Sequence, residues 1–126
     1  MRIYFAHPTS DYGTKRELEC LNRIKESFPG AEILNPNQRT HNELYLAQGM
    51  AYFERLVLEC NLVVAVPFPN GEWGMGVFRE AEVVSRNGGK VYELNHTLKE
   101  VDIKDIRPLS INETRKRTRE EKERRG

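Results

Sequence analysis

The 126-residue chain is poor in several features that mark common classes of protein. Its two cysteines, Cys20 and Cys60, form no Cys-x-x-Cys pair and have no histidine close by, which favours free thiols inside helices over a disulfide. His7, His41 and His96 lack metal-ligand spacing, so no metal is expected. No apolar run approaches the roughly 18 residues that a membrane-spanning helix needs, so no membrane association is expected.

Targeting and charge signals are also weak. The apolar run at the N-terminus is short and ends at His7-Pro8, which predicts a strand rather than a signal peptide, and a reducing cytoplasm as the location. The formal net charge is only +1, but residues 112–126 hold seven Lys or Arg against four Glu. The remaining residues are therefore slightly acidic, and nucleic acid is not expected as a partner.

What the sequence does contain is an alternation of two apolar patterns. Short apolar runs predict strands, and apolar residues at helical spacing predict helices between them. The alternation predicts a single-domain α/β fold, a flavodoxin- or Rossmann-like three-layer sandwich around a parallel sheet of four to five strands. The strands are expected at residues 2–6, 31–34, 62–66 and 90–94, with an edge-like fifth near 101–106, and the helices at 14–28, 42–60 and 77–86.

The α/β domain is expected to span residues 1–110, followed by a charged helix or tail over 111–126. Ser110 and Glu113 have the spacing of a capping box, which would open that last helix. No apolar residue follows Ile111, so we expect its far part to fray into solvent.

The most distinctive segment joins the third strand to the following helix. Gly74-Met75-Gly76 lets the backbone approach a ligand closely at a helix start, and Glu80 follows one helical turn later. Most glutamates on helices are simply solvated, but the position of Glu80 after the most apolar strand favours a functional role. Ligands in parallel sheets bind at the carboxyl ends of the strands, where this segment is expected to lie.

Other residues of these loops allow two interpretations each. Tyr4 lies in an apolar strand, so its hydroxyl needs a partner, which a carboxylate at a neighbouring strand end would supply. His7-Pro8 is either a simple turn or a ligand contact, and Ser10 either caps a helix or contacts phosphate or ribose. Trp73 either closes the core or stacks on a base.

Two common nucleotide sites are not expected. The segment from Gly74 to Arg79 lacks the third glycine of the dinucleotide fingerprint, and no Gly-Lys-Ser/Thr occurs. We therefore expect neither nicotinamide binding nor a nucleoside triphosphatase, and no cofactor.

Four segments together resemble a known family, the nucleoside 2-deoxyribosyltransferase-like proteins. Ile3-Tyr4-Phe5-Ala6-His7-Pro8 resembles their Tyr-x-Ala-x-Pro opening, and the run from Cys60 to Ala65 is similar to their segment of an acidic residue and an apolar strand. Gly76 to Glu80 matches the spacing of their Gly-Thr-x-x-Glu, and Val91 to Asn95 fits their last strand and terminal Asn. The superfamily also contains nucleoside 5′-monophosphate N-glycosidases.

The resemblance implies an enzyme that breaks the glycosidic bond of a small-molecule nucleoside or nucleotide. It makes Glu80 the catalytic nucleophile and Tyr4 the residue that orients it. The implied substrate-binding residues are His7, Pro8, Ser10, Asn61, Trp73, Gly74, Met75, Gly76 and Asn95.

The departures from the family favour hydrolysis of a monophosphate slightly over base exchange. Gly74, Val77 and Asn61 stand where the transferases have Asp, Thr and an acidic residue. Two alternatives stay open: a phosphoribohydrolase of the cytokinin-activating type, whose Pro-Gly-Gly signature is missing, and a non-catalytic nucleotide-binding module whose basic tail engages a partner.

Assembly is a further implication, because neighbouring subunits often complete the site in this family. We expect a homodimer or larger homo-oligomer. The candidate interface is the helix at 42–60, with Tyr45, Tyr52 and Phe53.

Overall fold

The computed structural model describes residues 1–37 and 50–125. Strands and helices alternate along most of the chain, with two short 3-10 turns, η1 and η2. The elements in chain order are β1 (Arg2–Ala6), η1 (Thr9–Asp11), α1 (Lys15–Ser27), β2 (Glu32–Leu34), α3 (Met50–Leu58), β3 (Leu62–Ala65), α4 (Met75–Arg86), β4 (Lys90–Leu94), β5 (Leu98–Glu100), η2 (Ile103–Asp105) and α5 (Ile111–Arg125).

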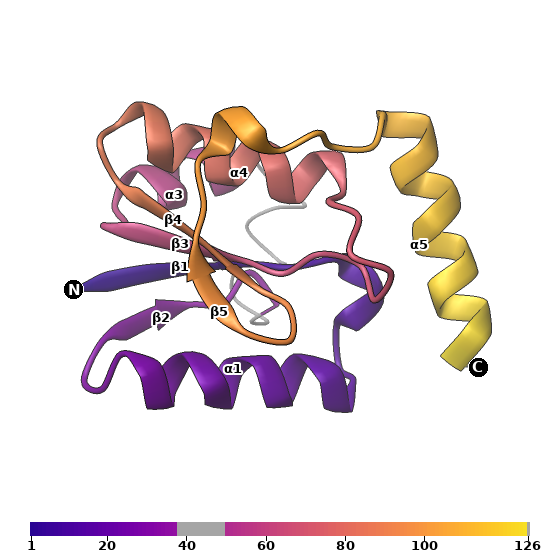
Figure 1. Cartoon of the computed structure of the whole chain (residues 1–126), viewed down its shortest axis with the longest axis horizontal. Coiled ribbons are helices and arrows are strands. Elements are labelled where there is room, and N and C mark those ends of the chain that lie inside the picture. Colours follow the sequence, from indigo (N-terminus) through magenta and orange to yellow (C-terminus); the bar gives the residue numbers. More distant parts are fainter. Residues whose placement is uncertain (38–49, 126) are drawn as a thin grey trace.

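The strands form one five-stranded sheet in the order β2-β1-β3-β4-β5. β1 to β4 run parallel, and β5 pairs antiparallel with β4. Helix α1 covers one face of the sheet, whereas α3 and α4 cover the other (Figure 1). The predicted α/β class with a mostly parallel sheet is therefore confirmed, and the carboxyl ends of β1 to β4 meet at one edge.

The sheet is buried because its side chains alternate between two apolar clusters. Ile3 and Phe5 pack on the side of α1, whereas Tyr4 and Ala6 pack on the side of α4. All four residues are fully buried. Burial on both faces explains why β1 reads as a continuous apolar run rather than as alternating polar and apolar residues.

The expected position of the fifth strand is wrong. The strand is Leu98–Glu100, and residues 103–105 form η2 instead. A turn closed by a hydrogen bond of 3.2 Å from the Asn95 amide to the Thr97 carbonyl folds the chain back, so that β5 pairs with β4 as a hairpin. The Asp102 side chain then accepts from the Lys104 amide and caps η2.

The prediction of a last helix is confirmed, whereas the fraying of its far part stays a prediction. Ser110 and Glu113 form the capping box, with each backbone amide donating to the other's side chain at 3.0 and 3.1 Å. The helix continues to Arg125 and packs against η1. Polar contacts replace the apolar stripe that such a helix usually needs, and they are described below.

The helix expected at 42–60 falls partly outside the described residues. The described α3 ends at Leu58, close to the predicted end. Of the three aromatic residues proposed for an interface, Tyr52 is buried within its own chain. Tyr45 and the side chain of Phe53 lie outside the described part.

The cysteines and the membrane prediction can also be compared with the structure. Cys20 and Cys60 are both free, as predicted, and both are half-buried. Burial raises the pKa of the Cys60 thiol to about 11. Within residues 1–37 and 50–125, no helix is long and apolar enough to cross a membrane.

Candidate active site at the Tyr4–Glu80 pair

The structure joins the two residues that the resemblance marks as catalytic. Tyr4 lies in the middle of β1 with its ring buried on the side of α4, and its hydroxyl donates a short hydrogen bond to Oε2 of Glu80. Glu80 lies on the second turn of α4. The expected carboxylate partner of Tyr4 therefore exists, but it comes from a helix packed over the sheet rather than from a strand end.

Burial changes the acidity of both groups. Desolvation raises the pKa of the Glu80 carboxyl to about 7, against which the hydrogen bond from Tyr4 acts in the opposite direction. Desolvation and the nearby Glu80 charge raise the pKa of the Tyr4 hydroxyl. Glu80 as a whole residue is only half-buried. The site therefore presents a carboxyl group that changes its ionisation near neutral pH and a tyrosine that stays protonated.

The glycine-rich segment forms the start of α4. Gly74 precedes the helix, and a side chain there would lie 3.2 Å from both Phe68 and Thr114. The Met75 amide donates to Oγ1 of Thr114 at 2.9 Å. Gly76 is exposed, with no atom within 4 Å of where its Cβ would be. The absence of a side chain at Gly74 thus lets α5 pack closely against the first turn of α4.

His7 is buried in a network of its own at the end of β1. Its ring stacks on Phe5 with a centroid separation of 3.8 Å. Nδ1 lies 3.1 Å from the Phe5 carbonyl oxygen, and Nε2 lies 2.6 Å from Oε2 of Glu17. A carbonyl and a carboxylate both accept hydrogen bonds, so each ring nitrogen lies beside an acceptor. Both ring nitrogens are thus engaged by the protein.

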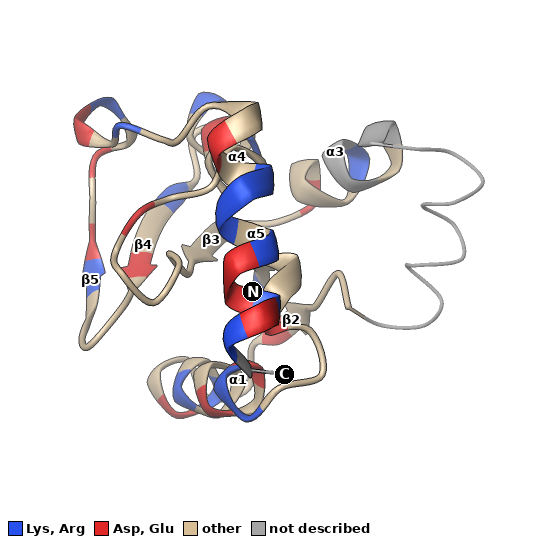
Figure 2. Cartoon of the chain, turned by 90° about the vertical axis from the view of Figure 1, so that its right-hand side faces the viewer, with Lys and Arg blue, Asp and Glu red and all other residues tan. Residues whose placement is uncertain are grey.

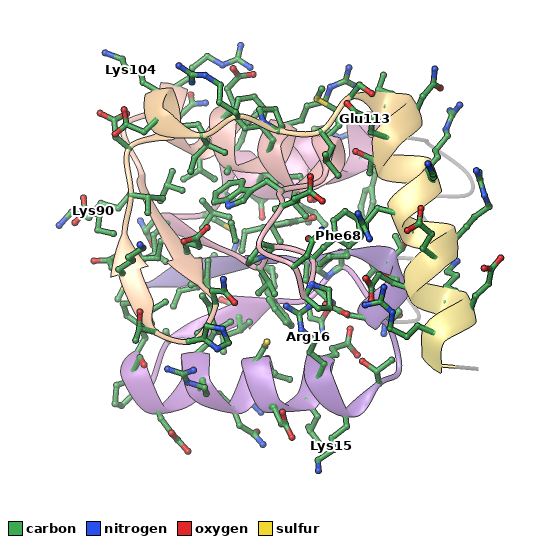
Figure 3. The ribbon with its side chains drawn as sticks, turned by 45° about the vertical axis from the view of Figure 1, so that its right-hand side comes forward. Lys15, Arg16, Phe68, Lys90, Lys104 and Glu113 are labelled. Carbon is green, nitrogen blue, oxygen red and sulfur yellow. The ribbon has the colours of Figure 1, made fainter. Side chains whose placement is uncertain are left out.

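The turn after His7 is also internal. Pro8 and Ser10 are both buried. Asp11 pairs with Arg16, whose Nη2 also donates to the Pro67 carbonyl at 2.9 Å. Arg16 is labelled in Figure 3. Burial raises the pKa of the Asp11 carboxyl, and Arg16 opposes that shift. These contacts tie the loop after β1 to the loop after β3, beside the proposed site.

Trp73 belongs to the core rather than to an open stacking surface. Its ring is 3% exposed and packs in the cluster on the side of α4. Its indole N–H donates to Oε2 of Glu93 at 2.7 Å. Of the two interpretations that the sequence allowed, core closure matches the structure.

Two other expected binding residues lie away from Glu80. Asn61 precedes β3, at the amino end of the parallel strands, and its Oδ1 accepts the Arg2 amide at 2.7 Å. Asn95 lines a cavity of about 260 Å³ between α1 and the end of β4, together with Arg16 and His96. The structure thus groups Tyr4, Glu80 and the start of α4, but it separates Asn61 and Asn95 from them.

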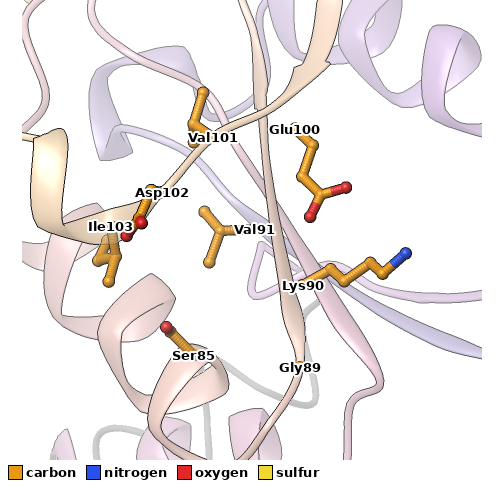
Figure 4. Close-up of a pocket in the computed structure, with 8 residues that line it drawn as sticks. All are labelled: Ser85, Gly89, Lys90, Val91, Glu100, Val101, Asp102 and Ile103. Carbon is orange, nitrogen blue, oxygen red and sulfur yellow. The ribbon is translucent and has the colours of Figure 1, made fainter.

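A larger cavity, of about 440 Å³, is unrelated to these residues. It lies beside the start of β4, between Ser85 at the end of α4 and the segment from Glu100 to Ile103 (Figure 4). None of the residues predicted for the site lines it. Over the described ranges, no group of three or more His, Cys, Asp or Glu could hold a metal ion.

Two residues that shape this region, Glu17 and Thr114, were not expected from the sequence. Glu17 holds His7 and also accepts the Gly13 amide at 3.2 Å. Its position three residues after Thr14, which caps α1, is a capping-box signal that could have placed it at the start of that helix. Thr114 carried no comparable signal, because 39 residues separate it from its partner Met75.

The chain was compared with profiles of protein families, with curated proteins and with solved structures, and none of these comparisons found a match. The resemblance to the nucleoside 2-deoxyribosyltransferase-like proteins therefore stays a prediction from the quoted segments.

Proposed function

We propose that this chain cleaves the N-glycosidic bond of a nucleoside or a nucleoside 5′-monophosphate, with Glu80 as the nucleophile and Tyr4 as the residue that orients it. The observation that carries the proposal is the hydrogen bond between the buried Tyr4 hydroxyl and the Glu80 carboxyl, whose pKa is about 7. Positive charge builds at C1′ of the sugar as the base leaves, and a carboxylate beside C1′ stabilises that charge or attacks it.

The proposed reaction needs no cofactor. The ionised Glu80 carboxylate bonds to C1′ while the bond from C1′ to the base nitrogen breaks, and the leaving base takes a proton from water. Water then cleaves the sugar ester in a hydrolase, whereas a second base does so in a transferase. Gly74 and Val77, which replace the Asp and Thr of the transferases, favour the hydrolase.

Replacement of one carboxylate tests the proposal. We expect Glu80→Gln to lower turnover by about 10³-fold or more while the ligand still binds, as is typical of a removed nucleophile. Glu82→Gln is the matched control, because Glu82 lies on the same helix and pairs with Arg86 at the surface. The measurement is chromatography of deoxy- and ribonucleosides and their 5′-monophosphates after incubation, with and without an acceptor base.

The outcomes separate the candidate functions. Free base from a monophosphate without an acceptor supports an N-glycosidase, and a new nucleoside only with an acceptor supports a transferase. Full activity in the Glu80→Gln variant would remove Glu80 from the mechanism. Ligand binding without turnover in any vessel would favour the non-catalytic nucleotide-binding module.

The proposal also includes a homo-oligomer, as the resemblance implies. Light scattering of the purified chain should give at least twice the monomer mass of 14.7 kDa. A monomeric mass in a fully active sample would contradict this part of the proposal and leave the role of Glu80 unaffected.

A further inference from the structure

Helix α5 lies across the edge of the sheet at which the parallel strands end. It runs from beside the start of α4 towards η1, apart from the helices that cover the two faces (Figure 1). This edge is where α/β proteins bind their ligands. The position of α5 therefore decides how open the proposed site is.

The side of α5 that faces the rest of the chain is polar. The residues that lose exposure recur at helical spacing, yet none is apolar. They are Thr114, Arg117, Thr118 and Glu121, with Glu120 at their margin. The one apolar residue of the helix, Ile111, is 43% exposed. A helix of a globular domain is ordinarily held by an apolar stripe, and α5 has none.

The near end of α5 is held by hydrogen bonds. Oγ1 of Thr114 accepts the Met75 amide at 2.9 Å, which ties α5 to the first turn of α4. Just before α5, the Leu109 amide donates to the Trp73 carbonyl at 2.9 Å. These two bonds are made to Trp73 and Met75, the residues on either side of Gly74.

The middle of α5 is held by charge. Arg117 pairs with Glu72 at 3.3 Å and with Glu120 at 3.2 Å, and these side chains are all partly exposed. Exposed ion pairs of this kind contribute little to stability. Figure 2 shows the acidic and basic residues that cover this helix from end to end.

The far end of α5 places like charges together. Glu121 is 9% exposed, and its charge contributes to the raised pKa of the buried Asp11 carboxyl. Oε1 of Glu121 has no hydrogen-bond partner in the described chain, although Arg124 lies 3.5 Å away. Arg16 and His7 offset the Asp11 charge, but the repulsion between the Glu121 and Asp11 carboxylates still opposes docking of this end of α5.

We propose that α5 and the residues leading into it form a strap that detaches from the edge of the sheet and thereby controls access to the site of Tyr4 and Glu80. Segments with few apolar contacts and solvent-exposed hydrogen bonds open well before the whole domain unfolds. The strap rests on the proposed function only for the identity of the ligand that it admits.

Opening can be followed without any ligand, because Trp73 is the only tryptophan of the chain. Trp73 is buried beside Gly74 and its carbonyl accepts the Leu109 amide, so we expect departure of the strap to loosen the packing around its ring. Acrylamide quenching of its fluorescence and hydrogen exchange of the α5 amides both measure the open fraction.

Two substitutions should shift that fraction in opposite directions. Thr114→Val removes the acceptor for the Met75 amide, together with the bond that the same hydroxyl donates to the Ser110 carbonyl within the chain leading into α5. We expect quenching and α5 exchange to rise about threefold or more, the effect of the one lost hydrogen bond to α4. Glu121→Gln removes the charge beside Asp11, and we expect both to fall. Thr118→Val is the matched control, because its hydroxyl bonds only within α5, to the Thr114 carbonyl at 2.8 Å.

Three results would overturn the strap. Exchange in α5 as slow as in β1 and β3 would show that the helix leaves only on global unfolding. Equal effects of Thr114→Val and Thr118→Val would show that the contact with α4 does not hold it. If a nucleoside 5′-monophosphate is a substrate, its turnover should be fastest in the Thr114→Val variant, slower in the unchanged chain and slowest in the Glu121→Gln variant. Any other ranking would show that the helix moves without controlling access.

Failure of the proposed function would give a different result from failure of the strap. If no variant turns over any substrate but quenching still changes as expected, the opening of the strap is supported and the glycosidase activity is contradicted.

Discussion

At the scale of single residues, the decisive feature is a carboxyl group whose ionisation is set by its surroundings. Glu80 lies against the buried Tyr4, and desolvation keeps its pKa near 7, well above the ordinary value of 4.5. A nucleophile must be ionised, so this shift links the proposed activity to pH.

The pH profile of activity tests that link. If Glu80 attacks as the carboxylate, kcat/KM should rise with pH through about 7. Tyr4→Phe removes the hydrogen bond that lowers the pKa of Glu80, so the rising limb should move to higher pH. Steady-state rates between pH 5 and 9 on a substrate found by the panel above measure both.

The control for this profile is Tyr92→Phe. Tyr92 packs edge-on against Phe28 on the opposite face of the sheet, so its loss should not move the limb. A profile that falls through pH 7 in the unchanged chain would instead make Glu80 a general acid.

The pairing of Tyr4 with a carboxylate could be predicted, because a hydroxyl inside an apolar strand must find a partner. The partner of His7 could not, because loop packing brings Glu17 to it. Trp73 allowed two interpretations because its surroundings depend on Glu93, 20 residues away.

At the scale of elements, local patterns predicted the parallel strands and their helices. They did not predict the position of the fifth strand or the contacts of the last helix. The fifth strand lies at Leu98–Glu100 because it pairs with β4, a tertiary contact that a three-residue segment cannot encode alone. The start of α5 was readable from its capping box, but its full length depends on contacts with η1 and the loop before α4.

The connection between α4 and β4 supplies a test at this scale. A methyl group at Gly89 would lie 2.8 Å from the Asn61 carbonyl oxygen and 2.5 Å from Cγ1 of Val84. We expect Gly89→Ala to lower the free energy of unfolding by about 1–3 kcal/mol, because the backbone of a neighbouring strand cannot move aside cheaply.

Gly76→Ala serves as the comparison, since no atom lies within 4 Å of its Cβ position and alanine favours a helix over glycine. Urea denaturation should find this variant no less stable than the unchanged chain. Equal stability of the Gly89→Ala variant would contradict the close packing of β3 and β4 at this point.

At the scale of the whole molecule, the sheet brings residues from separate segments to one edge, as the order β2-β1-β3-β4-β5 requires. The α/β class could be predicted because the alternation of patterns extends over most of the chain. The separation of Asn61 and Asn95 from Glu80 could not, because it depends on which end and which face of the sheet each residue reaches.

The Tyr4–Glu80 pair also makes folding a reaction that consumes protons. Between pH 4.5, the ordinary pKa of a glutamate, and about 7, the folded chain keeps a proton on Glu80 that the unfolded chain has already released. Folding in this window takes up a proton, so this group's contribution to stability is complete below pH 4.5 and is lost as the pH rises through 7. The ionisation of Glu80 that produces the proposed nucleophile therefore also lowers the free energy of unfolding of the domain.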